Sequence, residues 1–254
     1  MEGKTEAEIS GKFKAAAKRL VLLDYDGTLV IHTNAPGMAK LPEEMAGILR
    51  KLIKDPKTEL FIITGRGNED IDRFLDHLNI NIIAEHGALI KRDGKWENKI
   101  CGDNSWKEQI LPILDQVTAN CPDSYVEEKI HSLTWHYRSM VNASGYSCSR
   151  ELIEKLKKVI EPLNLKILDG NKVVEVMKEG IGKGRAVRQL LDRGKYDFIL
   201  SVGDDKTDEE MFEYLEHNPS AFTVKVGKGS TYARYNLQNI SEVASLLKNI
   251  SECV

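Results

Sequence analysis

The sequence lacks long apolar runs, an apolar leader and a strong excess of charge of either sign. Its longest apolar runs, such as Leu20–Leu23 and Leu60–Ile63, are far too short to cross a bilayer. The first ten residues, MEGKTEAEIS, are charged and do not form the apolar stretch of a signal peptide. A formal net charge of -3 gives no basic field that would hold nucleic acid. We therefore expect a cytoplasmic protein that binds neither membranes nor nucleic acid.

Cysteines are few and scattered. The four are Cys101, Cys121, Cys148 and Cys253, and no two have the C-x-x-C spacing of a zinc site. In a reducing compartment we expect four free thiols. The charged fraction of 30% and the hydrophobic fraction of 41% are ordinary for a globular protein. The 254 residues are enough for one large domain or two small ones, each with a core of its own.

The N-terminal part of the chain has the rhythm of a parallel α/β sheet. A short basic helix is predicted over 5–19, and the apolar run that follows ends at Asp24. Such a run is typical of a strand that is buried on both faces. The same rhythm continues with a helix over 41–54, a strand over 59–63, a helix over 68–78 and a strand over 81–84. Alternating strands and helices predict a parallel sheet.

The rhythm changes in the middle of the chain and then returns. Ala88 to Glu97 predicts a hairpin that turns at Asp93-Gly94. Beyond it we predict helices over 106–119 and 150–160 and strands over 130–137, 165–168 and 172–177. From Gly182 the pattern resumes with helices over 184–192, 207–216 and 240–250 and strands over 198–202 and 221–226. The predicted fold is a Rossmann-like parallel-sheet core, residues 1–102 and 181–254, interrupted by an α+β domain over 103–180.

Polar clusters follow three of the predicted core strands. The clusters are Asp24-Tyr-Asp26-Gly-Thr28, Thr64-Gly-Arg66 and Gly203-Asp204-Asp205-Lys-Thr-Asp208. The carboxyl ends of parallel strands meet at one edge of the sheet, where ligands bind. So many carboxylates repel one another unless a cation lies between them, and hard oxygen ligands favour Mg²⁺. A single aspartate of this kind is often a helix cap, but three strand ends together favour a metal site.

These clusters resemble the motifs of a known superfamily. DYDGTL resembles the first motif of the haloacid dehalogenase superfamily, and Thr64 in ITGR, Lys183 in the GKG segment and GDDKTDE resemble the second, third and fourth, in the same order. AEHGALI, VEEKIHSLTWHYR and GDDKTDEEMF together resemble trehalose-6-phosphate phosphatases, over roughly residues 16 to 250. The segment KFKAAAKRLVLLDYDGTL is similar to the entry to the phosphatase half of fused synthase–phosphatase chains. We therefore expect residues 1–15 to be a linker and a synthase domain or subunit to be a candidate partner.

The resemblance implies an Mg²⁺-dependent phosphatase that releases trehalose and phosphate from trehalose 6-phosphate. It implies that Asp24 is the nucleophile, forming an aspartyl-phosphate, and that Asp26 is the general acid and base. Thr64 would donate a hydrogen bond to the phosphate, and Lys183 would supply positive charge. Other readings of Lys183 are a surface lysine at a helix start or part of a P-loop, but the GxxxxGK[ST] spacing is absent.

The resemblance also implies the metal ligands and the phosphate contacts. The ligands would be Asp24, the backbone carbonyl of Asp26, and Asp204, with Asp205 and Asp208 supporting the ion directly or through these ligands. Substrate contacts on the same side are expected from Gly27, Gly65, Arg66 and His86. The two glycines would let the backbone approach the phosphate closely, whereas His86 could instead stabilise the protein around the site.

The inserted domain would be a cap that recognises the sugar. By resemblance its contacts are Glu127, Lys129 and Glu175, with Arg138 matching the same pattern; a solvated strand face is the alternative for these residues. Glu127 and Lys129 stand two apart and would share one face of a strand. Glu128 would replace Glu127 if the register differs by one residue. Trp135 is expected in the core, and His136 and Arg138 could be structural.

Three other functions compete with this reading. The chain could be another capped sugar phosphatase acting on sucrose phosphate or mannosyl-3-phosphoglycerate, or a phosphomannomutase-like transferase. It could also be a non-catalytic sugar-phosphate-binding module that regulates a synthase. The proposed nucleophile, acid, lysine and metal ligand are all present, which favours an enzyme. We expect it to be a monomer.

Overall fold

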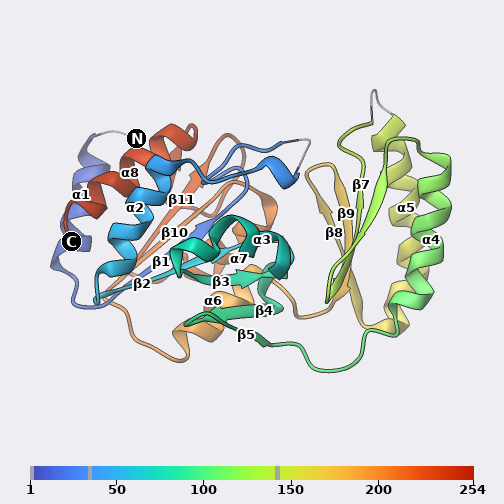
Figure 1. The fold of residues 1–254 in the computed structure, drawn as a ribbon, viewed down its shortest axis with the longest axis horizontal. Helices are drawn as coiled ribbons and strands as arrows, with labels where there is room; N and C mark the ends of the chain where they lie inside the picture. The colour runs from blue at the N-terminus through green and yellow to red at the C-terminus, as the bar shows by residue number, and fades with distance from the viewer. Residues whose placement is uncertain (1–2, 34–35, 141–143) are drawn as a thin grey trace. The chain divides into compact units, whose positions relative to one another are not determined.

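The chain divides into two compact units (Figure 1). The computed structural model describes residues 3–33, 36–140 and 144–254. The core unit comprises Met1–Lys99 and Gly182–Val254, and the inserted unit comprises Ile100–Ile181. The chain therefore leaves the core unit after Lys99 and returns to it at Gly182, and each unit has a hydrophobic core of its own.

An eight-stranded sheet forms the centre of the core unit. Its strand order is β12-β11-β10-β1-β2-β3-β4-β5, and the six strands from β12 to β3 are parallel to their neighbours. Their bounds are β1 (Arg19–Asp24), β2 (Thr58–Ile63), β3 (Asn81–Ala84), β10 (Phe198–Gly203), β11 (Ala221–Val226) and β12 (Tyr235–Leu237). The hairpin of β4 (Leu89–Arg92) and β5 (Lys95–Asn98) extends the sheet with antiparallel strands. The predicted parallel-sheet core is confirmed.

Helices cover both faces of this sheet because its central strands are apolar on both sides. In β1, Val21 and Leu23 belong to one buried cluster, whereas Leu20 and Leu22 belong to the other. The first cluster includes side chains of α1 (Gly3–Ala15), α2 (Glu43–Lys54), α3 (Asn68–Leu75) and α8 (Ile240–Ser251), and the second includes side chains of α6 (Lys183–Leu191) and α7 (Lys206–Leu215). The result is a three-layer α/β/α unit with a reversal of strand order at β1, where β2 lies on one side and β10 on the other.

The described residues of the inserted unit form a four-stranded antiparallel sheet and two α-helices. The strand order is β6-β7-β9-β8, from β6 (Tyr125–Glu128), β7 (Ser132–His136), β8 (Leu165–Gly170) and β9 (Val173–Lys178). The helices α4 (Lys107–Asn120) and α5 (Ser144–Ile160) lie on the same side of this sheet (Figure 1). Trp135 is fully buried between sheet and helices, as predicted. The other face of the sheet carries most of its polar side chains.

Several predictions about the chain outside the site need correction. Residues from Gly3 onward form α1 rather than a linker, because Ile9 and Phe13 on this helix are fully buried in the core; residues 1–2 lie outside the described part. The helix predicted over 150–160 begins earlier, at Ser144.

The prediction of four free thiols is also wrong. Cys121 at the end of α4 forms a disulfide with Cys148 in α5, whereas Cys101 and Cys253 are free thiols. The two helices pack against each other, so residues 27 apart in sequence become neighbours. Among the described helices, none combines the length and the apolar character that a membrane span requires.

Candidate active site

Asp24 and Lys183 form a buried ion pair at the carboxyl edge of the core sheet. Asp24 is the last residue of β1, and Lys183 is the first residue of α6. The Nζ atom of Lys183 lies 2.7 Å from Oδ1 of Asp24 and 2.8 Å from Oδ1 of Asp208, in the first turn of α7. The Lys183 side chain is only 2% exposed, so the reading as a surface lysine is wrong. One ammonium therefore links the two aspartates that flank it.

Burial and crowding shift the ionisation of these groups. Burial raises the pKa of Asp24 well above its ordinary value, Lys183 opposes the shift, and the nearby carboxylate of Asp208 adds to it. Burial likewise raises the pKa of Asp208, to about 7, against the effect of Lys183. Burial alone would lower the pKa of Lys183, but the two carboxylates hold it well above its usual range. More positive charge at this point would favour the ionised aspartates.

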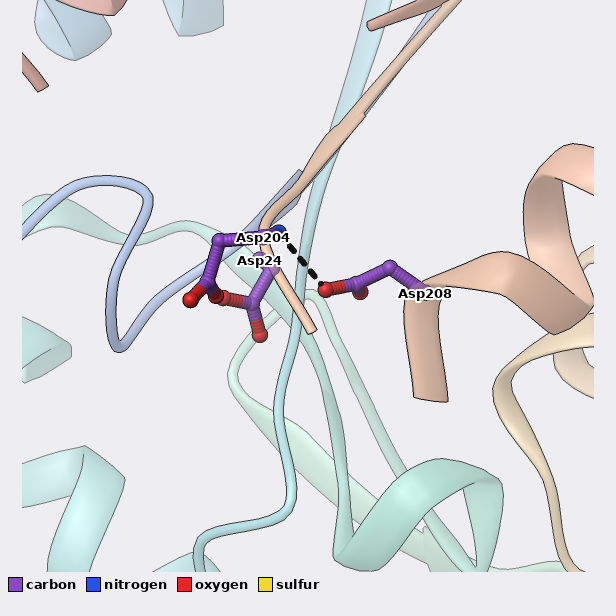
Figure 2. Close-up of side chains that lie close together, drawn as sticks. All are labelled: Asp24, Asp204 and Asp208. Atoms are coloured by element: carbon purple, nitrogen blue, oxygen red, sulfur yellow. Dashed lines mark hydrogen bonds between the residues drawn. The ribbon is translucent and has the colours of Figure 1, made fainter. Parts of the chain in front are cut away.

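Asp204 completes a carboxylate cluster that can hold a metal ion. Oxygen atoms of Asp24, Asp204 and Asp208 all lie within 4.8 Å of one another, and Figure 2 shows the side chains of Asp24 and Asp204 side by side, with Asp208 approaching from α7. Within the described residues, Oδ2 of Asp24 and Oδ1 of Asp204 are buried and have no hydrogen-bond partner. Buried carboxylate oxygens without donors are costly, so the donor set fits a hard divalent cation.

The carboxylates of Asp205 and Asp208 accept hydrogen bonds from groups of the protein around them. Asp205 caps α7, accepting hydrogen bonds from the backbone of Thr207 and Asp208 and from the Thr207 hydroxyl. Burial alone would raise the pKa of Asp205, but Lys183 and the Thr207 bonds lower it to about 2. Oδ2 of Asp208 accepts from the backbone N–H groups of Asp204 and Asp205 at 2.9 and 3.0 Å. Asp208 thus holds the backbone of Asp204, and Asp205 holds the first turn of α7, which carries Asp208.

Asp26 is held by Arg66. The guanidinium makes two parallel hydrogen bonds, each 2.7 Å long, to the two carboxylate oxygens of Asp26. Arg66 also pairs with Asp70 in the first turn of α3, and its guanidinium lies over the rings of Tyr25 and Phe74. In this structure the side chain orients the expected acid–base residue, and the substrate contact predicted for Arg66 stays a prediction. The side chain of Asp26 is 27% exposed and therefore accessible.

Thr64, Gly65 and His86 lie on two adjoining loops beyond β2 and β3. Thr64 follows Ile63, the residue paired with Asp24 in the sheet. The backbone N–H of His86 donates to the carbonyl of Thr64 at 3.0 Å, and a Cβ on Gly65 would lie 2.5 Å from the His86 ring. His86 itself is buried in a left-handed backbone conformation with φ 55°, a strained state that often marks functional sites.

Position 27 must be a glycine because the carboxylate of Asp204 lies against it. The φ of Gly27 is +86°, and a Cβ there would overlap the carboxylate of Asp204. Only glycine accepts both this backbone conformation and this close approach. In this structure, then, Gly27 and Gly65 make room for side chains of the site.

In the inserted unit, Glu127 and Glu175 lie in one row of the sheet. Glu127 pairs with Thr134 across β6 and β7, and Thr134 pairs with Glu175 across β7 and β9, so the three side chains share a face. Glu128 pairs with Leu133 and binds Lys107 of α4, which places it on the helix-covered face. The register therefore places Glu127, and not Glu128, on the same face of the sheet as Glu175.

Glu175 is buried in a paired state. Its Oε1 accepts from Lys129 Nζ at 2.9 Å and from the Ser132 hydroxyl at 2.6 Å, and its side chain is 3% exposed. The alternative of a solvated strand face is therefore wrong for Glu175. Lys129 lies just beyond the end of β6, so the condition that it and Glu127 share a strand is not met, but its long side chain still reaches the row.

A second pair, Glu127 with His136, lies on the same face of the sheet as Glu175. Glu127 binds His136 at 2.7 Å, and the His136 ring stacks on Tyr125 with centroids 4.6 Å apart. Burial alone would raise the pKa of Glu127, but the bond to His136 and the charge of Lys129 lower it. Arg138 lies past the end of β7 and donates a hydrogen bond to the carbonyl of Asn171 at 2.5 Å. Its side chain therefore contacts the turn between β8 and β9.

Sequence reasoning missed three contacts of the site. His32 binds Oδ2 of Asp204 at 2.9 Å, Lys225 donates to the carbonyl of Asp204 at 2.5 Å, and Ser132 binds Glu175. The sequence could have indicated Lys225, because a lysine inside the apolar strand sequence AFTVKV needs a partner for its charge. His32 and Ser132 had no such signal, because their partners are distant in the sequence.

The parallel-sheet core and the carboxylate cluster at its carboxyl edge define a protein of the haloacid dehalogenase-like fold. A family model described as trehalose-phosphatase matches residues 22–241. The chain belongs to the trehalose-phosphatase family.

Relatives and solved structures agree with this assignment. The chain is 38% identical over 251 residues to a protein of Thermoproteus tenax named bifunctional trehalose-6-phosphate synthase/phosphatase, a match that covers 98% of this chain and 34% of that protein. It is 33% identical over 229 residues to a trehalose-phosphatase of Saccharomyces cerevisiae, covering 80% of this chain and 25% of the relative. A solved structure of the C-terminal domain of a C. albicans trehalose-6-phosphate phosphatase superimposes with a TM-score of 0.92 at 28% identity, covering 98% of this chain and 97% of that one. The chain thus spans about a third of the length of the first curated relatives.

Proposed function

We propose that the protein is an Mg²⁺-dependent phosphatase that hydrolyses trehalose 6-phosphate to trehalose and phosphate, in trehalose biosynthesis. The observation that carries the proposal is the cluster of Asp24, Lys183, Asp204 and Asp208, with two buried carboxylate oxygens left without donors among the described residues. Asp24, the backbone carbonyl of Asp26, and Asp204 would hold the ion, with Asp205 and Asp208 orienting these ligands. A bound Mg²⁺ would neutralise the charge that builds up between carboxylate and phosphate.

The side chains then divide the reaction into two steps. The carboxylate of Asp24 attacks phosphorus, the bond from phosphorus to the sugar oxygen breaks, and Asp26 gives its proton to that oxygen. In the second step Asp26 takes a proton from water, which attacks the aspartyl-phosphate, releases phosphate and restores the carboxylate of Asp24. The guanidinium of Arg66 orients the side chain of Asp26, and Lys183 stabilises the phosphoryl oxygens together with Thr64.

Sugar selection belongs to the polar row of the inserted unit. Glu127, Lys129 and Glu175 are held by one another and by Ser132 and His136, so they offer fixed donors and acceptors to hydroxyl groups. A site built this way rejects sugars that lack the matching hydroxyls. Arg138 and His86 stay predicted substrate contacts. The monomeric state, the cytoplasmic location and a synthase domain or subunit as partner also stay predictions; the fused synthase/phosphatase relative supports the last.

The test is phosphate release from four sugar phosphates, each with Mg²⁺ and with a chelator. The panel is trehalose 6-phosphate, sucrose 6-phosphate, glucose 6-phosphate and mannosyl-3-phosphoglycerate. We expect Mg²⁺-dependent release with a strong preference for trehalose 6-phosphate. Mg²⁺-dependent preference for another sugar would overturn the assignment of the polar row but keep the aspartate chemistry, and no release from any would favour a non-catalytic binding module.

A further inference from the structure

We propose that His32 is a positioning residue that fixes the carboxylate of Asp204 for metal binding. The inference rests on the metal site of the proposed function. His32 lies in the segment after β1, 172 residues before Asp204 in the sequence, and its Nε2 is 2.9 Å from Oδ2 of Asp204. It belongs to none of the four sequence motifs that mark the site.

The two oxygens of Asp204 have different surroundings. Oδ2 accepts the ring N–H of His32, whereas Oδ1 is buried and has no hydrogen-bond partner in the part of the chain that the structure describes. A carboxylate with one oxygen bound to a donor keeps a fixed rotation and presents the other oxygen to an ion. Donors that bind ligand side chains in this way raise metal affinity by restricting the ligand.

Asp204 is restrained from three directions. The His32 ring binds its carboxylate, the backbone of Gly27 lies close against that carboxylate, and the Lys225 ammonium binds the carbonyl oxygen of Asp204. Gly27, His32 and Asp204 also line a cavity of about 370 Å³ that extends to the N-terminus of α8. Replacing Gly27 would place an atom against the Asp204 carboxylate, and replacing Lys225 would also remove the ion pair with Glu209, so His32 is the simplest of the three restraints to remove.

The contact is too exposed to serve mainly as a stabilising ion pair. The His32 side chain is 33% exposed and that of Asp204 is 16% exposed, and exposed pairs contribute little to stability. Its loss should therefore appear in metal affinity and not in the unfolding of the metal-free protein.

The experiment is calorimetric titration of Mg²⁺ into the full chain and three variants, together with thermal unfolding of each metal-free protein. We expect His32→Ala to weaken Mg²⁺ binding by roughly 10-fold. We expect His32→Gln to stay within about 3-fold of the parent, because the glutamine amide can donate from nearly the position of Nε2. His217→Ala is the matched control, since the His217 side chain is 93% exposed and lies outside the site.

Each outcome bears on the proposal. Parent-like Mg²⁺ affinity in His32→Ala would overturn it and leave the proposed function standing. Equal weakening in both His32 variants, with unchanged unfolding, would also overturn it, because the hydrogen bond would not be the cause. Absence of Mg²⁺ binding by the parent chain would instead remove the metal site, and with it both proposals.

Discussion

Each unit of the molecule buries a lysine against carboxylates, but the two arrangements have different charge balance. In the core unit, Lys183 lies between Asp24 and Asp208 while Asp204 stands beside them, and two carboxylate oxygens have no donor within the described residues. In the inserted unit, Lys129 pairs with Glu175, and His136 with Glu127.

The difference shows what each site can accept. Surplus carboxylate charge in a buried place calls for a cation, so the core cluster is suited to a metal ion and, through it, a phosphate. The paired row of the inserted unit needs no ion, and its fixed polar groups are suited to neutral hydroxyls. Variants that change one site and leave the other intact should therefore separate chemistry from sugar selection.

The largest effect is expected from Asp24→Asn. The amide has the shape of the carboxylate but is no nucleophile, so turnover should fall by roughly 10⁴-fold or more on every phosphate ester. Phosphate release measures this loss, and thermal unfolding checks that the fold persists. Parent-like turnover in the folded variant would contradict the role of Asp24.

Lys183→Met should combine lost activity with lost stability. Removing the ammonium leaves two buried carboxylates facing each other, which costs about 3–5 kcal/mol of unfolding free energy, measured by urea denaturation without metal. Lys91→Met is the matched control, since Lys91 is also nearly buried and binds two aspartates, Asp72 and Asp76. The control should keep its activity where it is folded; if it loses as much activity as Lys183→Met, the effect is one of stability alone.

Removal of the disulfide tests whether the stability of the inserted unit can be lowered without loss of the chemistry in the core unit. Replacing Cys121 and Cys148 together by serine should lower the unfolding free energy of the inserted unit by about 2–4 kcal/mol, because the link joins α4 to α5. Activity on p-nitrophenyl phosphate, which does not need the sugar contacts, should stay near that of the parent. Equal unfolding curves with and without the link would show that helix packing alone holds the unit.

The smallest and most selective effect is expected from Glu175→Gln. Its value of kcat/KM for trehalose 6-phosphate should fall by roughly 10- to 100-fold, about 1.4–2.7 kcal/mol, while that for p-nitrophenyl phosphate changes little. Glu128→Gln, on the opposite face of the same sheet, should affect neither substrate. Equal losses of Glu175→Gln on both substrates would mean that this residue supports the fold and not the sugar.

The sequence predicted the core unit better than the contacts of the site. Apolar runs that lead into the polar clusters marked β1, β2 and β10 within a residue or two, because a strand buried on both faces is apolar along its whole length. The inserted unit was harder: its helix α5 begins six residues before the predicted start at Arg150, since the first turns are polar and small. The pairing of Cys121 with Cys148 could not be predicted, because it depends on helix packing, and the strand register was needed to decide between the predicted Glu127 and its alternative Glu128.

The sequence by itself determined which residues are the candidates for the proposed chemistry. Local pattern is enough to find residues at the end of a strand or at the start of a helix. Four of the candidates lie at or just after strand ends and one begins α6: Asp24, Asp26, Thr64, Asp204 and Lys183. Three features depend on the tertiary structure. Among the described residues, it decides which carboxylate oxygens of Asp24 and Asp204 lack a hydrogen-bond donor. It also brings Arg66 to Asp26 and His32 to Asp204. Those contacts join residues that are 40 and 172 positions apart, and such distances are closed by the order of strands in a sheet, which no short stretch of sequence contains.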